Sequence, residues 1–147
     1  GSLSTPNDSS AEKQLEDQTI TELQVTYKSE KSFRVLEQLL IKLNDKKKYL
    51  ELEKQSTDGL ELFPAQPFVY LMNGKALNNN HQYKKALQSL QNGIDFVIDN
   101  TKIEAQFYFE MAKAYQKLND TKKASFFKNK AEKNCSRLST RTLPCQN

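Results

Sequence analysis

Apolar residues recur every three or four positions along most of the chain. In one stretch, for example, the apolar side chains are Phe33, Leu36, Leu39, Leu40 and Leu43, and polar residues separate them. This spacing places the apolar side chains on one face of an α-helix. Only four Gly and four Pro interrupt the 147 residues, which favours long helices over many short strands. The pattern therefore predicts an all-α fold of about seven helices.

The N-terminal part of the pattern predicts three of these helices. Residues 9–12 read S-x-x-E, the spacing of a capping box, so we expect a helix to begin there and to run to about Lys31. Ser32 is expected to cap the next helix, and Asp45 the one after it. That third helix is expected to end at Phe63, because the proline that follows disfavours helical geometry in the residue before it.

The rest of the pattern predicts four more helices, arranged in two pairs. Residues 67–100 read as two antiparallel helices joined by a polar turn at 78–81, where Asn tolerates left-handed backbone geometry. Residues 101–104 read T-x-x-E and form a second expected capping box. A strongly patterned helix follows and ends at the turn 119–120. The last helix is expected to end near Lys133.

Composition agrees with a single helical domain at residues 11–134, between a disordered leader at 1–10 and an irregular tail at 135–147. Charged residues make up 27% of the chain and hydrophobic residues 37%. No apolar run approaches the length of a membrane-spanning helix, so no membrane insertion is expected. The pair Gly1-Ser2 without a Met is typical of the remnant of a cleaved expression tag.

The charge pattern argues against nucleic-acid binding. The chain carries 22 cationic residues and a net charge of +4, but only three of the cations are Arg. Arg is the side chain that most often reads bases and phosphates in a bidentate manner. Lys residues interspersed with acids are instead typical of a solvated surface. No recognised nucleic-acid motif accompanies them.

Similar residues recur along the chain at fixed offsets. Tyr49 and Gly59 correspond to Tyr83 and Gly93 at an offset of 34, and Ala86 corresponds to Ala124 at an offset of 38. A single helix pair cannot bury its own apolar face, so such units stack on one another. The larger offset predicts about one extra helical turn in or after the second helix of the middle copy, around residues 96–102.

This repeat resembles the tetratricopeptide repeat (TPR) family over about residues 33–138. The middle copy matches at Tyr70, Gly74, Leu77, Tyr83, Ala86, Leu90 and Gly93. The third copy matches at Tyr108, Ala112, Tyr115, Ala124 and Ala131, with Lys128 at the aromatic position and Phe127 beside it expected to fill the gap. The first copy is degenerate and matches at Leu36, Leu43, Tyr49, Gly59 and Pro64. The long middle copy also resembles TPR proteins of the bacterial cell envelope, which implies a periplasmic or envelope location if a signal segment precedes the chain.

The resemblance implies a right-handed α-solenoid of about three helix pairs plus an N-terminal helix. In the family, the first helix of each pair lines a concave groove that binds a peptide or a partner protein. The family positions place the groove at Phe68, Leu71, Lys75, Asn78 and Asn79, and at Gln106, Phe109, Lys113, Gln116 and Lys117. The implied function is a non-catalytic interaction scaffold. The alternative is a structural C-terminal cap of a longer array, or a self-association module, without a groove ligand.

The remaining candidate chemistry is sparse. Cys135 and Cys145 could close a small loop in an oxidising compartment, or remain two thiols in a reducing one. The single His, His81, has no Cys or His at ligand spacing, so no metal site is expected. The sequence lacks a Gly-rich phosphate loop and a nucleophile elbow. We therefore expect no catalytic residues, no cofactor and no enzymatic activity.

Overall fold

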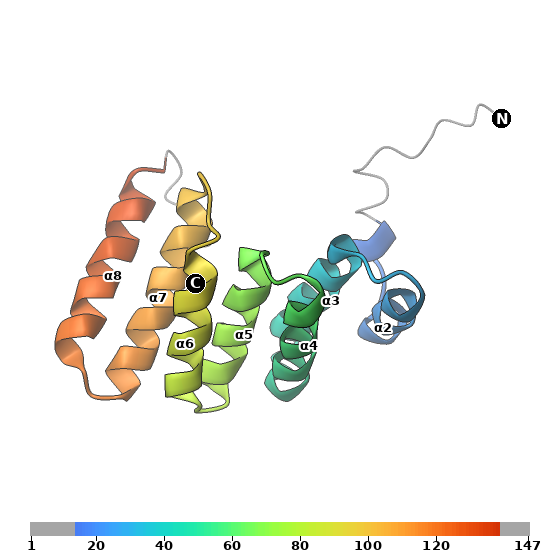
Figure 1. The fold of residues 1–147 in the computed structure, drawn as a ribbon, viewed down its shortest axis with the longest axis horizontal. Coiled ribbons are helices and arrows are strands. Elements are labelled where there is room, and N and C mark those ends of the chain that lie inside the picture. The colour runs from blue at the N-terminus through green and yellow to red at the C-terminus, as the bar shows by residue number, and fades with distance from the viewer. Residues whose placement is uncertain (1–13, 139–147) are drawn as a thin grey trace. The chain divides into compact units, whose positions relative to one another are not determined.

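The computed structural model describes residues 14–138, and over that range the chain is helical without any strand (Figure 1). The all-α prediction is therefore confirmed. The chain divides into two units, the first ending at Lys48 and the second beginning at Tyr49. The helices are α2 (Ile20–Ser29), α3 (Phe33–Asp45), α4 (Tyr49–Leu62), α5 (Pro67–Asn79), α6 (Tyr83–Ile94), α7 (Thr101–Lys117) and α8 (Thr121–Ser136).

The first unit contains α2 and α3, which contact each other. The expected continuous N-terminal helix is wrong, because the chain leaves the helical conformation after residue 16 and α2 begins only at Ile20. The sequence T-x-x-E explains the new start. The Thr19 hydroxyl accepts from the backbone N–H of Glu22 at 3.2 Å, and the Glu22 carboxylate accepts from the Thr19 N–H at 3.0 Å. The capping box expected at residues 9–12 lies outside the described residues.

The start of α3 agrees with the sequence, but the start of α4 does not. The Ser32 hydroxyl accepts from the Val35 N–H at 3.3 Å, so the predicted cap of α3 is confirmed. Asp45 caps nothing, because it is the last residue of α3. A turn with a left-handed residue, Lys47, separates it from α4.

The second unit contains α4 to α8, which follow one another side by side (Figure 1). Each helix contacts the next one along the chain, and α7 contacts α5 as well as α6. The helices α5 and α6 form one antiparallel hairpin, and α7 and α8 form a second. The second helices of the two hairpins begin at Tyr83 and Thr121. These residues are 38 positions apart, which equals the offset seen in the sequence.

The turns after α3, α5 and α7 repeat in the same register. Lys47, His81 and Asn119 all have positive φ angles, of 58°, 64° and 63°. In each turn the next residue donates its N–H to the carbonyl five residues earlier, at 2.8–2.9 Å. The polar turn predicted between α5 and α6 is confirmed, although the left-handed residue is His81 rather than an Asn. Residues separated by the sequence offsets of 34 and 38 thus have equivalent backbone geometry in these turns.

Two glycines allow the helices of the second unit to approach closely. A Cβ atom on Gly74 of α5 would lie 2.5 Å from the Leu90 side chain of α6. A Cβ atom on Gly93 of α6 would overlap Tyr70 of α5 and would lie 3.0 Å from Phe107 of α7. Any side chain at these positions would force its neighbours to move, since helix interfaces are packed to crystal-like density. Small residues thus set the spacing of α5, α6 and α7.

Side-chain amides fix α4 against the following hairpin. The Asn73 amide donates to the hydroxyls of Ser56 and Thr57, both at 3.0 Å. The Asn80 amide, in the turn after α5, donates to the Glu53 carboxylate at 2.8 Å. These polar groups have partners within the fold, as buried polar groups require. They specify the register between α4 and α5 more sharply than apolar contacts alone would.

The extra residues of the middle copy lie in a longer loop and in one additional turn at the start of α7, which begins four residues before the position that corresponds to Pro67. Helix α6 ends at Ile94, and the chain remains non-helical until α7 begins at Thr101. Within this loop the Phe96 ring stacks on Tyr70 at a centroid distance of 5.6 Å and an interplanar angle of 19°. Asp99 has a φ of 49°, which turns the chain toward α7. The structure therefore places the expected lengthening after the second helix.

The ends of the last hairpin differ slightly from the sequence prediction. Asn100 caps α7, because its side-chain oxygen accepts from the Ile103 N–H at 3.0 Å, so the expected box at 101–104 is displaced by one residue. Helix α8 continues to Ser136, beyond the expected end near Lys133. The Asn134 amide explains the extension, because it is buried and donates to the Glu104 carboxylate of α7 at 2.7 Å.

Candidate functional site

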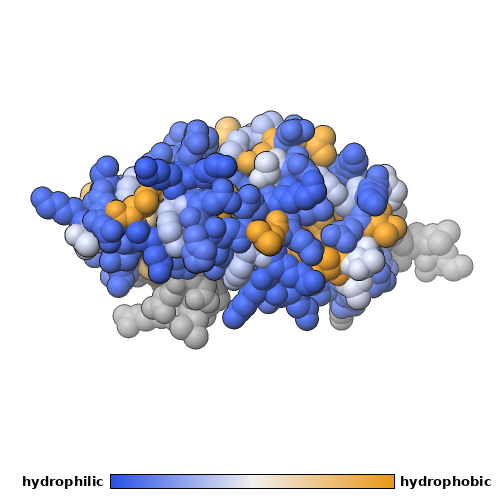
Figure 2. Space-filling view, turned by 90° about the horizontal axis from the view of Figure 1, so that it is seen from below, coloured by the Kyte–Doolittle hydropathy of each residue, from blue (hydrophilic) through white to orange (hydrophobic). Residues whose placement is uncertain are grey.

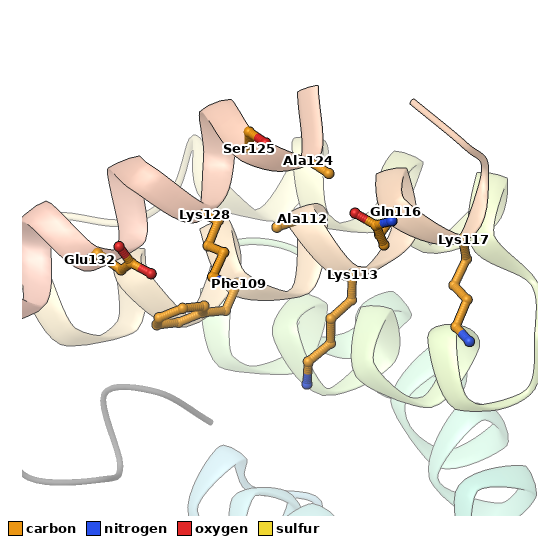
Figure 3. A pocket seen from close by; sticks show the side chains of 9 residues that line it. All are labelled: Phe109, Ala112, Lys113, Gln116, Lys117, Ala124, Ser125, Lys128 and Glu132. Carbon is orange, nitrogen blue, oxygen red and sulfur yellow. The ribbon is translucent and has the colours of Figure 1, made fainter. Parts of the chain in front are cut away.

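A hollow of about 700 Å³ lies between α7 and α8 (Figure 3). Both helices contribute side chains to it. Its lining consists of Phe109, Ala112, Lys113, Gln116 and Lys117 from α7, and Ala124, Ser125, Lys128 and Glu132 from α8. Figure 3 shows Lys113 and Lys117, one turn apart on α7, extending in the same direction. We call this feature the α7–α8 hollow.

The α7–α8 hollow combines an apolar base with a polar rim. Ala112 and Ala124 are 8% and 6% exposed, and their small side chains let α7 and α8 approach each other. Phe109 is half-buried and adds an aromatic ring. Gln116 and Ser125 are exposed and offer hydrogen-bonding groups. Such a combination of a few apolar contacts with convergent polar groups is typical of ligand sites.

The charges around the α7–α8 hollow are unequal. The Lys113 ammonium lies 2.9 Å from the carboxylate of Glu110, which is 1% exposed. This buried carboxylate partly neutralises Lys113. Lys117 and Lys128 form no ion pair among the residues that the structure describes, and Glu132 is the one acid in the lining. The rim thus presents two unpaired ammonium groups beside a single carboxylate.

The structure separates the five predicted groove residues of α5 from the hollow. Leu71 and Asn78 are only 2% and 8% exposed. The Asn78 amide donates to the Glu110 carbonyl at 3.0 Å and thereby links α5 to α7. Phe68 and Lys75 are half-buried, and Asn79 is exposed. Two of the five side chains are therefore occupied by packing, and none of the five lines the hollow.

The predicted groove residues of α7 are placed differently. Phe109, Lys113, Gln116 and Lys117 line the hollow together, whereas Gln106 is half-buried outside it. The α8 side of the lining was not predicted as a site at all. The sequence offset could have found it, because three of the four lining positions of α8 correspond to positions on α6 that carry larger apolar residues.

The α7–α8 hollow is the counterpart of a covered surface on the preceding hairpin. Leu87 and Leu90 of α6 are 9% and 0% exposed, and α7 packs against α5 and α6. At the offset of 38 these two positions become Ser125 and Lys128, which are both exposed. No helix among residues 14–138 covers α7 and α8 as α7 covers the earlier pair. Where Leu90 packs against Gly74 in the preceding hairpin, the hollow has Lys128 and Ala112, so polar residues replace an apolar contact between the two helices.

Phe127 does not fill the position that Lys128 leaves without an aromatic residue. Its ring instead stacks on Tyr115 at 5.6 Å and 6°, and lies 5.9 Å from the ring of Tyr108. Burial raises the pKa of the Tyr108 hydroxyl, and the charge of Glu104 raises it further. The rings of Tyr108, Tyr115 and Phe127 therefore gather outside the hollow.

The remaining candidates show little grouping. Cys135 is half-buried near the end of α8, but Cys145 lies outside the described residues, so their pairing stays a prediction. The exposed His81 ring lies 2.8 Å from the Tyr83 hydroxyl. Within residues 14–138 no three His, Cys, Asp or Glu side chains are grouped to hold a metal ion. Over the same range no helix has the length and hydropathy needed to cross a membrane.

Comparison with known proteins adds no family to these observations. Neither a protein-family model nor a curated protein matches the chain. The class that the structure defines is an all-α protein with helical hairpins in equivalent geometry and a polar-rimmed hollow on the last of them. On the face seen in Figure 2, hydrophobic residues form small separate patches within a largely hydrophilic surface.

Proposed function

We propose that this chain is a TPR-like, non-catalytic scaffold that binds a peptide or a segment of a partner protein. The α7–α8 hollow carries the proposal, because four of the ten predicted groove residues line it. The recurrence of the same turn geometry at offsets of 34 and 38 residues supports the TPR-like arrangement. In that arrangement the first helix of each pair faces the ligand, and here that helix is α7.

The chemistry of the hollow suits a short segment with one apolar side chain. A side chain of the ligand would rest on Phe109 and on the alanines at the base. The amide of Gln116 and the ammonium of Lys117 would bind carbonyl or carboxylate oxygens of the same segment. A volume of about 700 Å³ is in the range of ordinary ligand sites.

Peptide selection followed by affinity measurement tests the proposal. Peptides are selected from a display library on the immobilised chain, and a selected peptide is then titrated calorimetrically. We expect Phe109→Ala to weaken its binding by roughly tenfold or more, because buried aromatic residues dominate interface energies. Ile98→Ala is the control, since this apolar residue is 81% exposed and lies outside the hollow. Equal losses in both variants, or a failure to select any peptide, would contradict the proposal.

A second candidate function is a structural cap at the end of a helical array. The observation that favours it is the replacement of Leu87, Leu90 and Ile94 by Ser125, Lys128 and Glu132 at the equivalent positions. Terminal repeats need such a polar outer face to remain soluble. For a cap, the double variant Ser125→Leu/Lys128→Leu should self-associate in sedimentation experiments. The unmodified chain should remain monomeric, and no selected peptide should depend on Phe109.

A further inference from the structure

Helix α8 carries a second surface, on a side that does not line the hollow. Its residues are Lys122, Lys123, Phe126, Lys130 and Lys133, all exposed, and we call it the basic aromatic face. The Phe126 side chain is 55% exposed and lies among the four lysines. The face contains no acid, because the one acid of α8 lines the hollow. Helix α8 holds five Lys and one Glu, so its net charge equals the +4 of the whole chain.

The aromatic rings hold two of these lysines at the surface. The Lys130 ammonium lies 5.1 Å from the centroids of both Phe126 and Tyr108, and the Lys123 ammonium lies 5.4 Å from the ring of Tyr115. Cation–π contacts of this length orient the ammonium groups and cover the rings with the aliphatic stems. The charges are therefore ordered on the surface before any partner arrives, which lowers the entropy lost on binding.

The preceding hairpin shows that packing does not require this face. At the offset of 38, Phe126, Lys130 and Lys133 correspond to Gln88, Asn92 and Asp95 of α6 and its end. Lys122 and Lys123 correspond to two further lysines of α6. The same backbone thus forms with amides and an acid where α8 has an aromatic residue and two more cations. Helix pairing therefore explains neither the exposed ring nor the added charge of α8.

We propose that the basic aromatic face binds an acidic segment of a partner protein that carries an apolar side chain. Carboxylates of the segment would pair with the ordered ammonium groups, and its apolar side chain would rest on Phe126. The Phe126 ring meets Phe127 edge-on at a centroid distance of 5.1 Å and lies beneath Lys130. It therefore lies along the surface and does not project as a bilayer anchor would. The face also lacks Arg, the usual reader of nucleic-acid phosphates and bases.

Fluorescence anisotropy with a defined probe tests this surface. The probe is a labelled peptide in which Glu alternates with Leu, and its control has Gln in place of every Glu. The unmodified chain should bind the Glu peptide, and added salt should weaken the binding. Phe126→Gln combined with Lys130→Asn, which transplants the residues of α6, should weaken it by roughly tenfold or more. Both positions are exposed, and circular dichroism checks that the variant remains helical.

Matched controls separate this surface from net charge and from the α7–α8 hollow. Lys85→Asn removes one positive charge from α6 and should change the affinity by no more than about twofold. Phe109→Ala should leave the affinity for the Glu peptide unchanged. The basic aromatic face can therefore fail its test while the hollow still binds a ligand, and the hollow can fail while the face binds the peptide. Several results would overturn the inference: no binding of the Glu peptide, equal binding of the Gln peptide, or an equal loss in Lys85→Asn. Tighter binding to phosphatidylserine vesicles or to single-stranded RNA than to the peptide would also overturn it.

Discussion

The hairpin of α5 and α6 and the hairpin of α7 and α8 share a backbone but differ in what covers them. Their turns have left-handed residues at His81 and Asn119 with nearly equal φ angles. On the first hairpin Leu90 is fully buried against Gly74, and on the second the equivalent Lys128 is exposed. The comparison shows that the turn and the small interhelical residues define the unit. Residues at the remaining positions can then either pack against a neighbouring helix or remain exposed to solvent.

The same difference decides whether a residue contributes to stability or is available for binding. A position on α5 or α6 that faces α7 contributes to stability, because α7 removes it from water. Its equivalent on α7 or α8 contributes little to stability and is available to a ligand. Substitutions at equivalent positions of the two hairpins should therefore have unequal effects, and the alanine, amide and tyrosine pairs below test that inequality.

The largest difference is expected for a charge introduced at the equivalent alanines. Ala86 is fully buried between helices, so Ala86→Glu should lower the free energy of unfolding by about 4 kcal/mol or more, which unfolds most of a marginally stable domain. Ala124 lines the hollow, where a longer side chain can reach water, so Ala124→Glu should cost about 1–2 kcal/mol. Thermal unfolding followed by circular dichroism measures both. Equal melting temperatures would show that Ala124 is as tightly enclosed as Ala86, contrary to the difference between the two hairpins.

The next comparison is between two glycines, Gly93, which contacts α5 and α7, and Gly74, which contacts α6. Gly93→Ala should cost about 2 kcal/mol, because the new methyl group meets Tyr70 next to its backbone and the ring of Phe107. Gly74→Ala should cost less than about 1 kcal/mol. The methyl group there meets the Leu90 side chain at its Cγ and methyl carbons and no backbone atom, and alanine favours the helix. Chemical denaturation of the two variants provides the measurement. A more stable Gly93→Ala variant would refute the close contact between α5, α6 and α7.

A smaller difference is expected for the equivalent amides Asn78 and Gln116. Asn78→Ala removes a buried hydrogen bond to the Glu110 carbonyl and should cost about 1–2 kcal/mol. Gln116 is exposed on the rim of the hollow, and Gln116→Ala should change stability by no more than about 0.5 kcal/mol. Denaturant titration measures the free energy of unfolding of both variants. If Gln116→Ala proved the costlier change, the rim of the hollow would be a structural contact and not a free surface.

The sequence predicted much of the fold because most helices have local signals. The apolar stripe of α3 and the cap at Ser32 are local, and the structure has both. The break before α2 was missed because its T-x-x-E signal lies within an apolar pattern that continues across it. The end of α8 was missed because Asn134 is fixed by a contact with Glu104, 30 residues away. Such a contact has no local signature in the sequence.

The candidate site was only partly predictable for a similar reason. Family positions identified Phe109 and the neighbouring polar residues of α7, which line the hollow. The same positions on α5 include Leu71, which is buried, because exposure depends on the neighbouring helices and not on the repeat position. The α8 residues at the hollow were overlooked, since a polar residue on a helix ordinarily indicates only a solvated face. Comparing each copy with its equivalent, residue by residue, would have singled out Ser125 and Lys128.

The smallest effect concerns the equivalent tyrosines Tyr70 and Tyr108. The Tyr70 hydroxyl donates to the Pro64 carbonyl at 2.7 Å, whereas burial and the charge of Glu104 raise the pKa of Tyr108. A raised pKa means that the folded state holds the proton more tightly than the unfolded state. Stability from Tyr108 is therefore present below its ordinary pKa of about 10 and is lost as the pH rises above it. Glu104→Gln, which introduces the residue found at the equivalent position 66, should lower the ionisation midpoint in a spectrophotometric titration. Because burial is the larger cause, the shift should shrink without vanishing, and an unchanged midpoint would rule out the influence of Glu104.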